Sequence, residues 1–248
     1  MSLQLTLIGI GTGNPEHLTL QAIRAMNAQD LILIPRKGTG KDDLAQLRRD
    51  ICAEVLINTA TRIAEFELPV RNEATLDYRQ RVDDWHDAIA AVWQDAIIVH
   101  GGAKKVALLV WGDPSLYDST LRIAARLDPA PEITVIPGIT SLQALTAAHA
   151  TVLNEIGAPF IVTTGRRLRD EGWPQGVDAV AVMLDSGSAF GTIAPDGIHI
   201  WWGAYVGMTE QIIVEGLLSK VADEITQTRA RARADHGWIM DIYLLKKI

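Results

Sequence analysis

Residues 111–117, Trp-Gly-Asp-Pro-Ser-Leu-Tyr, carry the side chains best placed for chemistry. An uninterrupted apolar run at 106–110 precedes them and predicts a strand buried on both faces. Gly112 allows a ligand to approach the backbone, Asp113 supplies a carboxylate and Pro114 stiffens the loop. Open α/β sheets bind ligands at the carboxyl ends of their strands. We therefore expect this loop to line a small-molecule site, the alternative being a plain strand-to-helix turn.

Two further loops have related chemistry. The strand predicted at 3–8 runs into Gly9-Ile-Gly11-Thr12-Gly13-Asn14, which implies that something lies close to the backbone there. Asn14 replaces the third glycine of Gly-x-Gly-x-x-Gly, so the loop disfavours a dinucleotide site and an NAD-dependent oxidoreductase. The strand predicted at 133–136 ends in Pro-Gly-Ile-Thr140-Ser141, which opens a helix with free N–H groups suited to an anion.

The elements around these loops alternate between strands and helices, which is typical of an α/β fold. Because several strand ends in each half carry glycine or polar loops, we expect two α/β lobes, 1–116 and 117–248, with a cleft between them. The predicted strands are 3–8, 31–34, 106–110, 133–136, 160–163, 179–184, 198–202 and 238–245. The predicted helices begin at 19, 41, 77, 118, 141 and 209, and a further helix ends before Gly237.

Net charge and residue composition limit the classes of function that this chain can have. The net charge of −7 gives no overall basic field for nucleic acid or an anionic membrane. Arg229, Arg231 and Arg233 are flanked by acidic residues, so we expect a solvated helix face there. The single cysteine, Cys52, is predicted to lie in the core and suits a reducing compartment. With no signal-like start, no membrane-length apolar run and no metal-ligand spacing, we expect a cytoplasmic protein without a bound metal.

Four segments in this order resemble the tetrapyrrole (precorrin/uroporphyrinogen) methylase family over nearly the whole chain. They are Leu7-Ile-Gly-Ile-Gly-Thr-Gly-Asn-Pro-Glu-His-Leu-Thr19, the 111–117 loop, Val135-Ile-Pro-Gly-Ile-Thr-Ser141, and Thr209-Glu-Gln211 before Gly216-Leu217. Thr12 replaces a common Pro of the family, Trp111 replaces a common Gly, and Trp201-Trp202-Gly203 replaces a more polar strand end. These departures bear on substrate contacts more than on the cofactor class.

The resemblance implies an S-adenosyl-L-methionine-dependent methyltransferase, working as a homodimer on a polycarboxylate tetrapyrrole. It implies cofactor contacts at Thr12, Trp111, Gly112, Asp113, Leu116, Tyr117, Thr140, Ser141, Met183, Leu184, Gly203 and Ala204. Substrate contacts are expected at Gly11, Arg36, Lys37, Arg166 and Arg167, since arginine binds carboxylates in bidentate fashion.

Within the family, residues 35–38, 47–52, 85–86, 183–185 and 237–245 resemble a cobalamin-synthesis branch that methylates precorrin-5 at C1 with loss of acetate. Loss of acetate requires water to add to a carbonyl, for which a general base is expected. Asp113, Tyr117 and Asp185 are the predicted catalytic residues, His17 is a further candidate base, and the choice stays open. The alternatives are another acceptor (a different precorrin carbon or diphthamide) or a non-catalytic ligand-binding α/β module.

Overall fold

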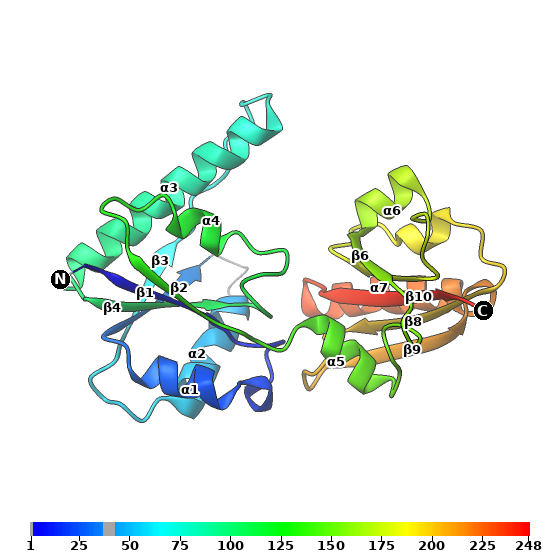
Figure 1. Ribbon diagram of the computed structural model, residues 1–248, viewed down its shortest axis with the longest axis horizontal. Helices are drawn as coiled ribbons and strands as arrows, with labels where there is room; N and C mark the ends of the chain where they lie inside the picture. Colours follow the sequence, from blue (N-terminus) through cyan, green and yellow to red (C-terminus); the bar gives the residue numbers. More distant parts are fainter. Residues whose placement is uncertain (1, 37–42) are drawn as a thin grey trace. The chain divides into compact units, whose positions relative to one another are not determined.

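The structure is a computed structural model that describes residues 2–36 and 43–248 (Figure 1). The chain forms two units, Met1–Thr140 and Ser141–Ile248, and each contains a five-stranded sheet. The boundary expected after residue 116 therefore lies too early. The reason is that β5 (Glu132–Ile136) pairs in parallel with β1 (Gln4–Gly9), so the chain returns to the first sheet before it leaves unit 1.

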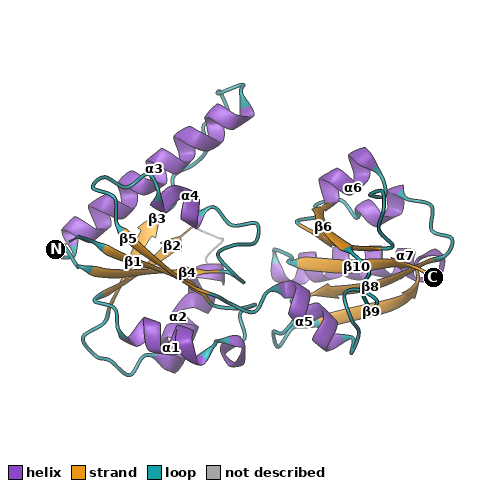
Figure 2. Ribbon diagram, in the orientation of Figure 1, coloured by secondary structure: helices purple, strands orange, loops and turns teal. Residues whose placement is uncertain are grey.

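Unit 1 is a parallel sheet covered on both faces, with strand order β3-β2-β4-β1-β5. The remaining strands are β2 (Leu31–Arg36), β3 (Arg62–Glu67) and β4 (Lys105–Val110). One face packs against α1 (Leu20–Asn27) and α2 (Asp43–Val55), and the other against α3 (Tyr78–Val99) and α4 (Thr120–Ala124) (Figure 2). Strands covered on both faces read as continuous apolar runs, which is why β1, β2 and β4 were predictable.

The edge strand β3 was not predictable from the sequence. Its sequence, Arg-Ile-Ala-Glu-Phe-Glu, buries only Ala64 and Phe66, on one face, and among the described residues this strand pairs on one side only, with β2. Such a short, charged segment lacks the apolar run that identified its neighbours. Cys52 is buried in unit 1, as predicted.

Unit 2 is a mixed sheet with strand order β6-β7-β10-β8-β9. The central strand β10 is antiparallel to both of its neighbours, so β7 and β8 point the same way and end at the same edge. The strands are β6 (Phe160–Thr164), β7 (Ala179–Met183), β8 (Ile198–Ala204), β9 (Ile212–Leu217) and β10 (Asp241–Lys247). The helices are α5 (Ser141–Ala148), α6 (Gly165–Glu171) and α7 (Leu218–His236), with a short 3-10 turn η2 (Ala189–Thr192).

The helix predicted from Thr209 is wrong, because residues 212–217 form strand β9, antiparallel to β8. Exposure alternates along β9, with Ile212 and Val214 less exposed than Ile213 and Leu217, which is the period of two of a strand. Ile212, Ile213 and Leu217 also fit helical spacing, and this short apolar run could not decide between the two. α7 begins only at Leu218 and ends where Gly237 adopts a φ of +72°, as the predicted stop requires.

Within the described part of the chain, no helix combines the length and the apolar character needed to cross a membrane.

Candidate functional site in the strand-end loops

Three loops meet at the carboxyl edge of the unit 1 sheet, since β4, β1 and β5 are parallel neighbours. Gly11 N–H donates to the Gly112 carbonyl at 3.3 Å, and Gly112 N–H donates to the Gly11 carbonyl at 2.7 Å. A Cβ at Gly138 would lie 2.1 Å from the Gly112 oxygen, and one at Gly9 would lie 2.6 Å from the Gly138 nitrogen. The close neighbour that these glycines admit is thus another loop of the same unit.

Asp113 ties two of these loops together. Its Oδ2 accepts a hydrogen bond from Gly138 N–H at 2.8 Å, and its Oδ1 accepts from the N–H and the hydroxyl of Ser115 at 2.8 and 2.5 Å. Burial raises the pKa of this carboxyl, but the three hydrogen bonds outweigh it and hold the pKa below its usual value. Asp113 is therefore ionised at neutral pH, and its predicted catalytic role stays a prediction.

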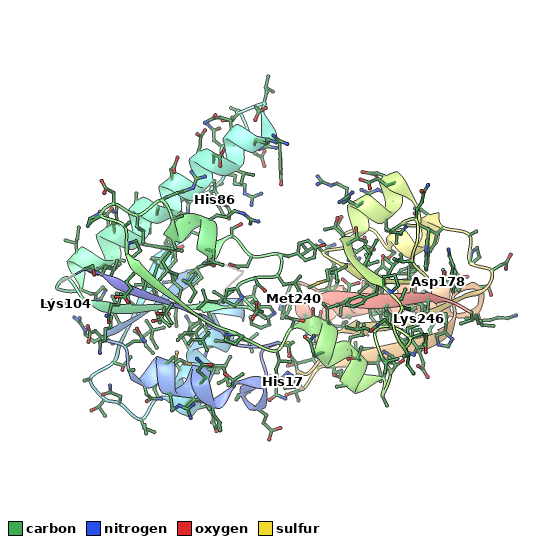
Figure 3. The ribbon with its side chains drawn as sticks, viewed as in Figure 1. His17, His86, Lys104, Asp178, Met240 and Lys246 are labelled. Atoms are coloured by element: carbon green, nitrogen blue, oxygen red, sulfur yellow. The ribbon has the colours of Figure 1, made fainter. Side chains whose placement is uncertain are left out.

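His17 closes over the first glycine loop from the 3-10 turn η1 (Pro15–His17) (Figure 3). Its Nδ1 lies 2.8 Å from the hydroxyl oxygen of Thr12, which is 4% exposed. Its Cβ lies where a side chain at Gly11 would extend, 2.8 Å from the position of an added Cβ. In this arrangement the Thr12 hydroxyl is already engaged by His17.

In unit 2 the loop after β7 is organised around Asp185, which is 5% exposed. Its Oδ1 accepts from Gly187 N–H at 2.9 Å, and its Oδ2 accepts from Ala189 N–H at 2.6 Å and from the Tyr243 hydroxyl at 2.7 Å. A Cβ at Gly165 would overlap this carboxylate. The contacts give Asp185 a role in holding the loop, and its catalytic role stays a prediction.

Arg229 of α7 continues this network, so its predicted place on a solvated helix face is wrong. Its side chain is 11% exposed. Nη2 donates to the Asp185 carbonyl at 2.6 Å, and Nε donates to Asp241 Oδ2 at 2.8 Å. Burial lowers the pKa of Arg229, but the hydrogen bond and charge of Asp241 outweigh it and raise the pKa, so the guanidinium stays charged. The sequence showed no local signal, because Asp241 lies 12 residues away, beyond the end of the helix, and Asp185 lies 44 residues away.

Three large residues adopt left-handed backbone conformations in loops that follow strands. They are Tyr117 after β4 (φ +50°), Leu184 after β7 (φ +53°) and Tyr205 after β8 (φ +50°). Such conformations are costly for residues with a Cβ and concentrate at functional sites. Leu184 is also 65% exposed and Tyr117 45% exposed. Two of the predicted cofactor residues are thus strained and open to solvent.

The other predicted cofactor residues occupy varied positions. Trp111 is partly buried, Leu116 N–H donates to the Asp113 carbonyl at 3.2 Å, and Ser141 is the first residue of α5. Thr140 comes directly before α5, and Met183 ends β7. Gly203 and Ala204 lie buried within β8 instead of in a loop, and a Cβ at Gly203 would lie 2.5 Å from Val206 Cγ1. Gly203 therefore makes room for a side chain of its own unit.

The predicted substrate arginines already have carboxylate partners in two cases. Arg36 forms ion pairs with Glu65 at 3.4 Å and Glu67 at 3.6 Å. Arg167 contacts Glu171 through Nη2 at 2.8 Å and Nε at 3.0 Å. Arg166 is exposed on α6, and Lys37 lies outside the described residues. Among those residues, no cluster of three or more histidine, cysteine or acidic side chains could hold a metal ion.

The chain belongs to the tetrapyrrole (corrin/porphyrin) methylases, whose family model matches residues 4–222. Among its relatives, precorrin-6A synthase (deacetylating) from Sinorhizobium sp is 47% identical over 98% of this chain and 95% of its own. A crystal structure from Corynebacterium diphtheriae, described as cobalamin-synthesis related (CobF), superposes with a TM-score of 0.84 at 36% identity over 99% of both chains.

A structure of lower sequence identity supports the fold of this chain. Uroporphyrin-III C-methyl transferase from Thermus thermophilus, complexed with S-adenosylhomocysteine, gives a TM-score of 0.56 at 17% identity, covering 98% of this chain and 97% of its own. The α/β class expected from the sequence is confirmed by these neighbours.

Proposed function

We propose that this chain is an S-adenosylmethionine-dependent C-methyltransferase of cobalamin biosynthesis that methylates precorrin-5 at C1 with loss of acetate, giving precorrin-6A. The observation that carries the proposal is the 47% identity to precorrin-6A synthase (deacetylating) over nearly the full length of both chains. Membership of the family alone does not identify which carbon or molecule accepts the methyl group.

Residues of this chain fit the proposed cofactor. Leu184 presents an exposed apolar side chain from a strained backbone, a feature suited to packing against a flat group such as adenine. When bound, S-adenosylmethionine supplies a methyl group already activated on a sulfonium. The protein then mainly has to align the acceptor carbon with that methyl group.

The three predicted catalytic residues, Asp113, Asp185 and Tyr117, lie in different environments. Asp113 has a lowered pKa and three hydrogen bonds, which makes it a weak base and suits it to shaping the loops of unit 1. Asp185 is buried among donors of unit 2, which suits it to positioning the loop that carries Met183 and Leu184. Tyr117, strained and 45% exposed, is the one we propose to face the substrate.

The test is to incubate the protein with methyl-labelled S-adenosylmethionine and precorrin-5, and to follow both labelled tetrapyrrole and free acetate. Equal amounts of the two are expected. Methyl transfer without acetate would indicate a different acceptor carbon, and binding of S-adenosylhomocysteine without any turnover would indicate a non-catalytic module. By the same resemblance we propose a cytoplasmic homodimer, which sedimentation and cell fractionation would test.

A further inference from the structure

The chain leaves two neighbouring strands of unit 1 in opposite directions. After β2 it passes through α2 to β3 on one side, and after β4 it passes through α4 to β5 on the other. The two helices pack on opposite faces of the sheet. In open α/β sheets, ligands bind outside the carboxyl ends of strands at such a point. We call the region between the carboxyl ends of β2 and β4 the β2–β4 switch point.

The two strands stop pairing early at the switch point. Their register ends at Leu33 and Leu108, although β4 continues to pair with β1 as far as Val110. The Val110 carbonyl accepts from Ile10 N–H on the β1 side. Because carbonyls alternate along a strand, the Leu109 carbonyl points toward β2. The next donor along β2 would be Pro35, which has no N–H, so the ladder leaves this carbonyl unpaired.

Arg48 of α2 occupies that gap. Its Nε donates to the Leu109 carbonyl at 3.0 Å, and its Nη1 donates to the Leu44 carbonyl at 3.0 Å. Its guanidinium lies 5.9 Å from the centre of the Trp111 ring, at the start of the predicted cofactor loop. Among the described residues, Nη2 has no hydrogen-bond acceptor, and the side chain is only partly buried. The Nη2 side of the guanidinium thus has no acceptor among these residues.

The charge of Arg48 is less compensated than that of its neighbours. Arg36 and Arg49 each contact the carboxylate of Glu65. Among the described side chains, those of residues 2–36 and 44–248, no carboxylate forms an ion pair with Arg48, and Asp118 acts on it only at longer range. Burial lowers the pKa of Arg48 to about 10, so it remains protonated at neutral pH. Because the Arg48 side chain keeps some exposure, a ligand carboxylate can reach it, and pairing would add a charge-assisted contact that the neutral carbonyls do not provide.

We propose that Arg48 binds a carboxylate of the tetrapyrrole substrate at the β2–β4 switch point, beside Trp111. The inference rests on the proposed function for the polycarboxylate nature of the substrate. It assigns the contact to a residue that sequence reasoning missed, because Leu47-Arg48-Arg49 reads as an ordinary charged helix surface. Pro35, directly after the strand predicted at 31–34, was the available signal, since it marks the missing donor.

The test compares Arg48→Met with Arg49→Met, two adjacent arginines of one helix. The probe is uroporphyrin III, a stable tetrapyrrole octacarboxylate, titrated by quenching of tryptophan fluorescence. S-adenosylhomocysteine affinity is measured in parallel by calorimetry, and folding by thermal unfolding. We expect Arg48→Met to weaken uroporphyrin III binding at least tenfold, the size expected for a charge-assisted contact. Arg49→Met should change it less than twofold, and neither variant should alter S-adenosylhomocysteine binding.

Equal uroporphyrin III affinities in the two variants would overturn the proposal. A loss of S-adenosylhomocysteine affinity with unchanged uroporphyrin III binding would also overturn it, because Arg48 would then bind the carboxylate of the cofactor. If Arg48→Met fails to fold, Arg48→Lys keeps the charge without the planar fork, and it should weaken uroporphyrin III binding several-fold. Unchanged binding in that variant would also overturn the proposal. Failure of the proposed function is seen separately, as wild-type protein that releases no acetate from precorrin-5.

Discussion

The two units shape their strand-end loops by different means. In unit 1 the loops touch through backbone at Gly9, Gly112 and Gly138, and one carboxylate, Asp113, joins them. In unit 2 the loop after β7 is held by buried side chains, with Asp185 accepting three hydrogen bonds and Arg229 bridging from α7 to Asp241. The unit 1 loops depend on glycines, which have no side chain at the points of contact. The unit 2 loop depends on every side chain of its hydrogen-bond network.

The difference sets how each unit responds to substitution. Backbone contacts fail when any Cβ is added, whatever its chemistry, because the obstacle is steric. A buried ionic network fails when one member is removed, because the remaining charge stays desolvated and unpaired.

Arg229→Met should lower the free energy of unfolding by about 3 kcal/mol, because it leaves Asp241 buried without its cation. Chemical denaturation of the full chain measures the loss. Arg231→Met is the matched control, since Arg231 is exposed two residues further along the same helix, and its change should stay within about 0.5 kcal/mol. Similar losses in both variants would mean that the network does not hold unit 2.

Gly138→Ala should lower the free energy of unfolding by about 2 kcal/mol, because its Cβ would lie 2.1 Å from the Gly112 oxygen and push two loops apart. S-adenosylhomocysteine affinity, followed by calorimetry, should fall as well if the unit 1 loops hold the cofactor. Gly191→Ala is the control, since no atom lies within 4 Å of its added Cβ. A stable Gly138→Ala protein would show that these loops can separate without cost.

The same contrast explains what the sequence could predict. The unit 1 loops were identifiable because strand, glycine turn and helix follow one another within a few residues, as around Gly112. The Asp185 network was not, because Arg229 and Tyr243 lie 44 and 58 residues further along the chain. Arg229 shares a helix with truly exposed arginines, and no local pattern distinguishes it from them. Strand β9 was misassigned for a related reason, since pairing with β8 decided its structure.

Asp113→Asn should lower the free energy of unfolding by about 1.5 kcal/mol at neutral pH, because hydrogen bonds to a charged acceptor are stronger than those to an amide. Since folding lowers the pKa of Asp113, its contribution is complete above the ordinary carboxyl pKa of 3.8 and is lost as pH falls through the lower value in the folded protein. The gap between wild type and variant should therefore close as denaturation is repeated below pH 3.8. A gap that persists there would rule out the charge as its source.

The smallest effect concerns His86, which lies buried on α3 in unit 1 (Figure 3). Among the described residues neither ring nitrogen has a hydrogen-bond partner, in contrast to the satisfied carboxylate of Asp185. Burial lowers the pKa of His86, and the positive charge of Arg126 lowers it further. The unfolded chain therefore binds the extra proton more readily, and stability should fall as pH drops below the ordinary value of 6.5.

His86→Leu should remove that part of the pH dependence and raise the free energy of unfolding at pH 7 by up to about 1 kcal/mol, since an apolar group replaces an unsatisfied polar one. His100→Leu, at the end of the same helix, should leave the dependence in place. Denaturation of both variants between pH 5 and 7 measures the difference. An unchanged pH slope in His86→Leu would mean that His86 binds its proton equally well in the folded and the unfolded chain, which would contradict the lowered pKa.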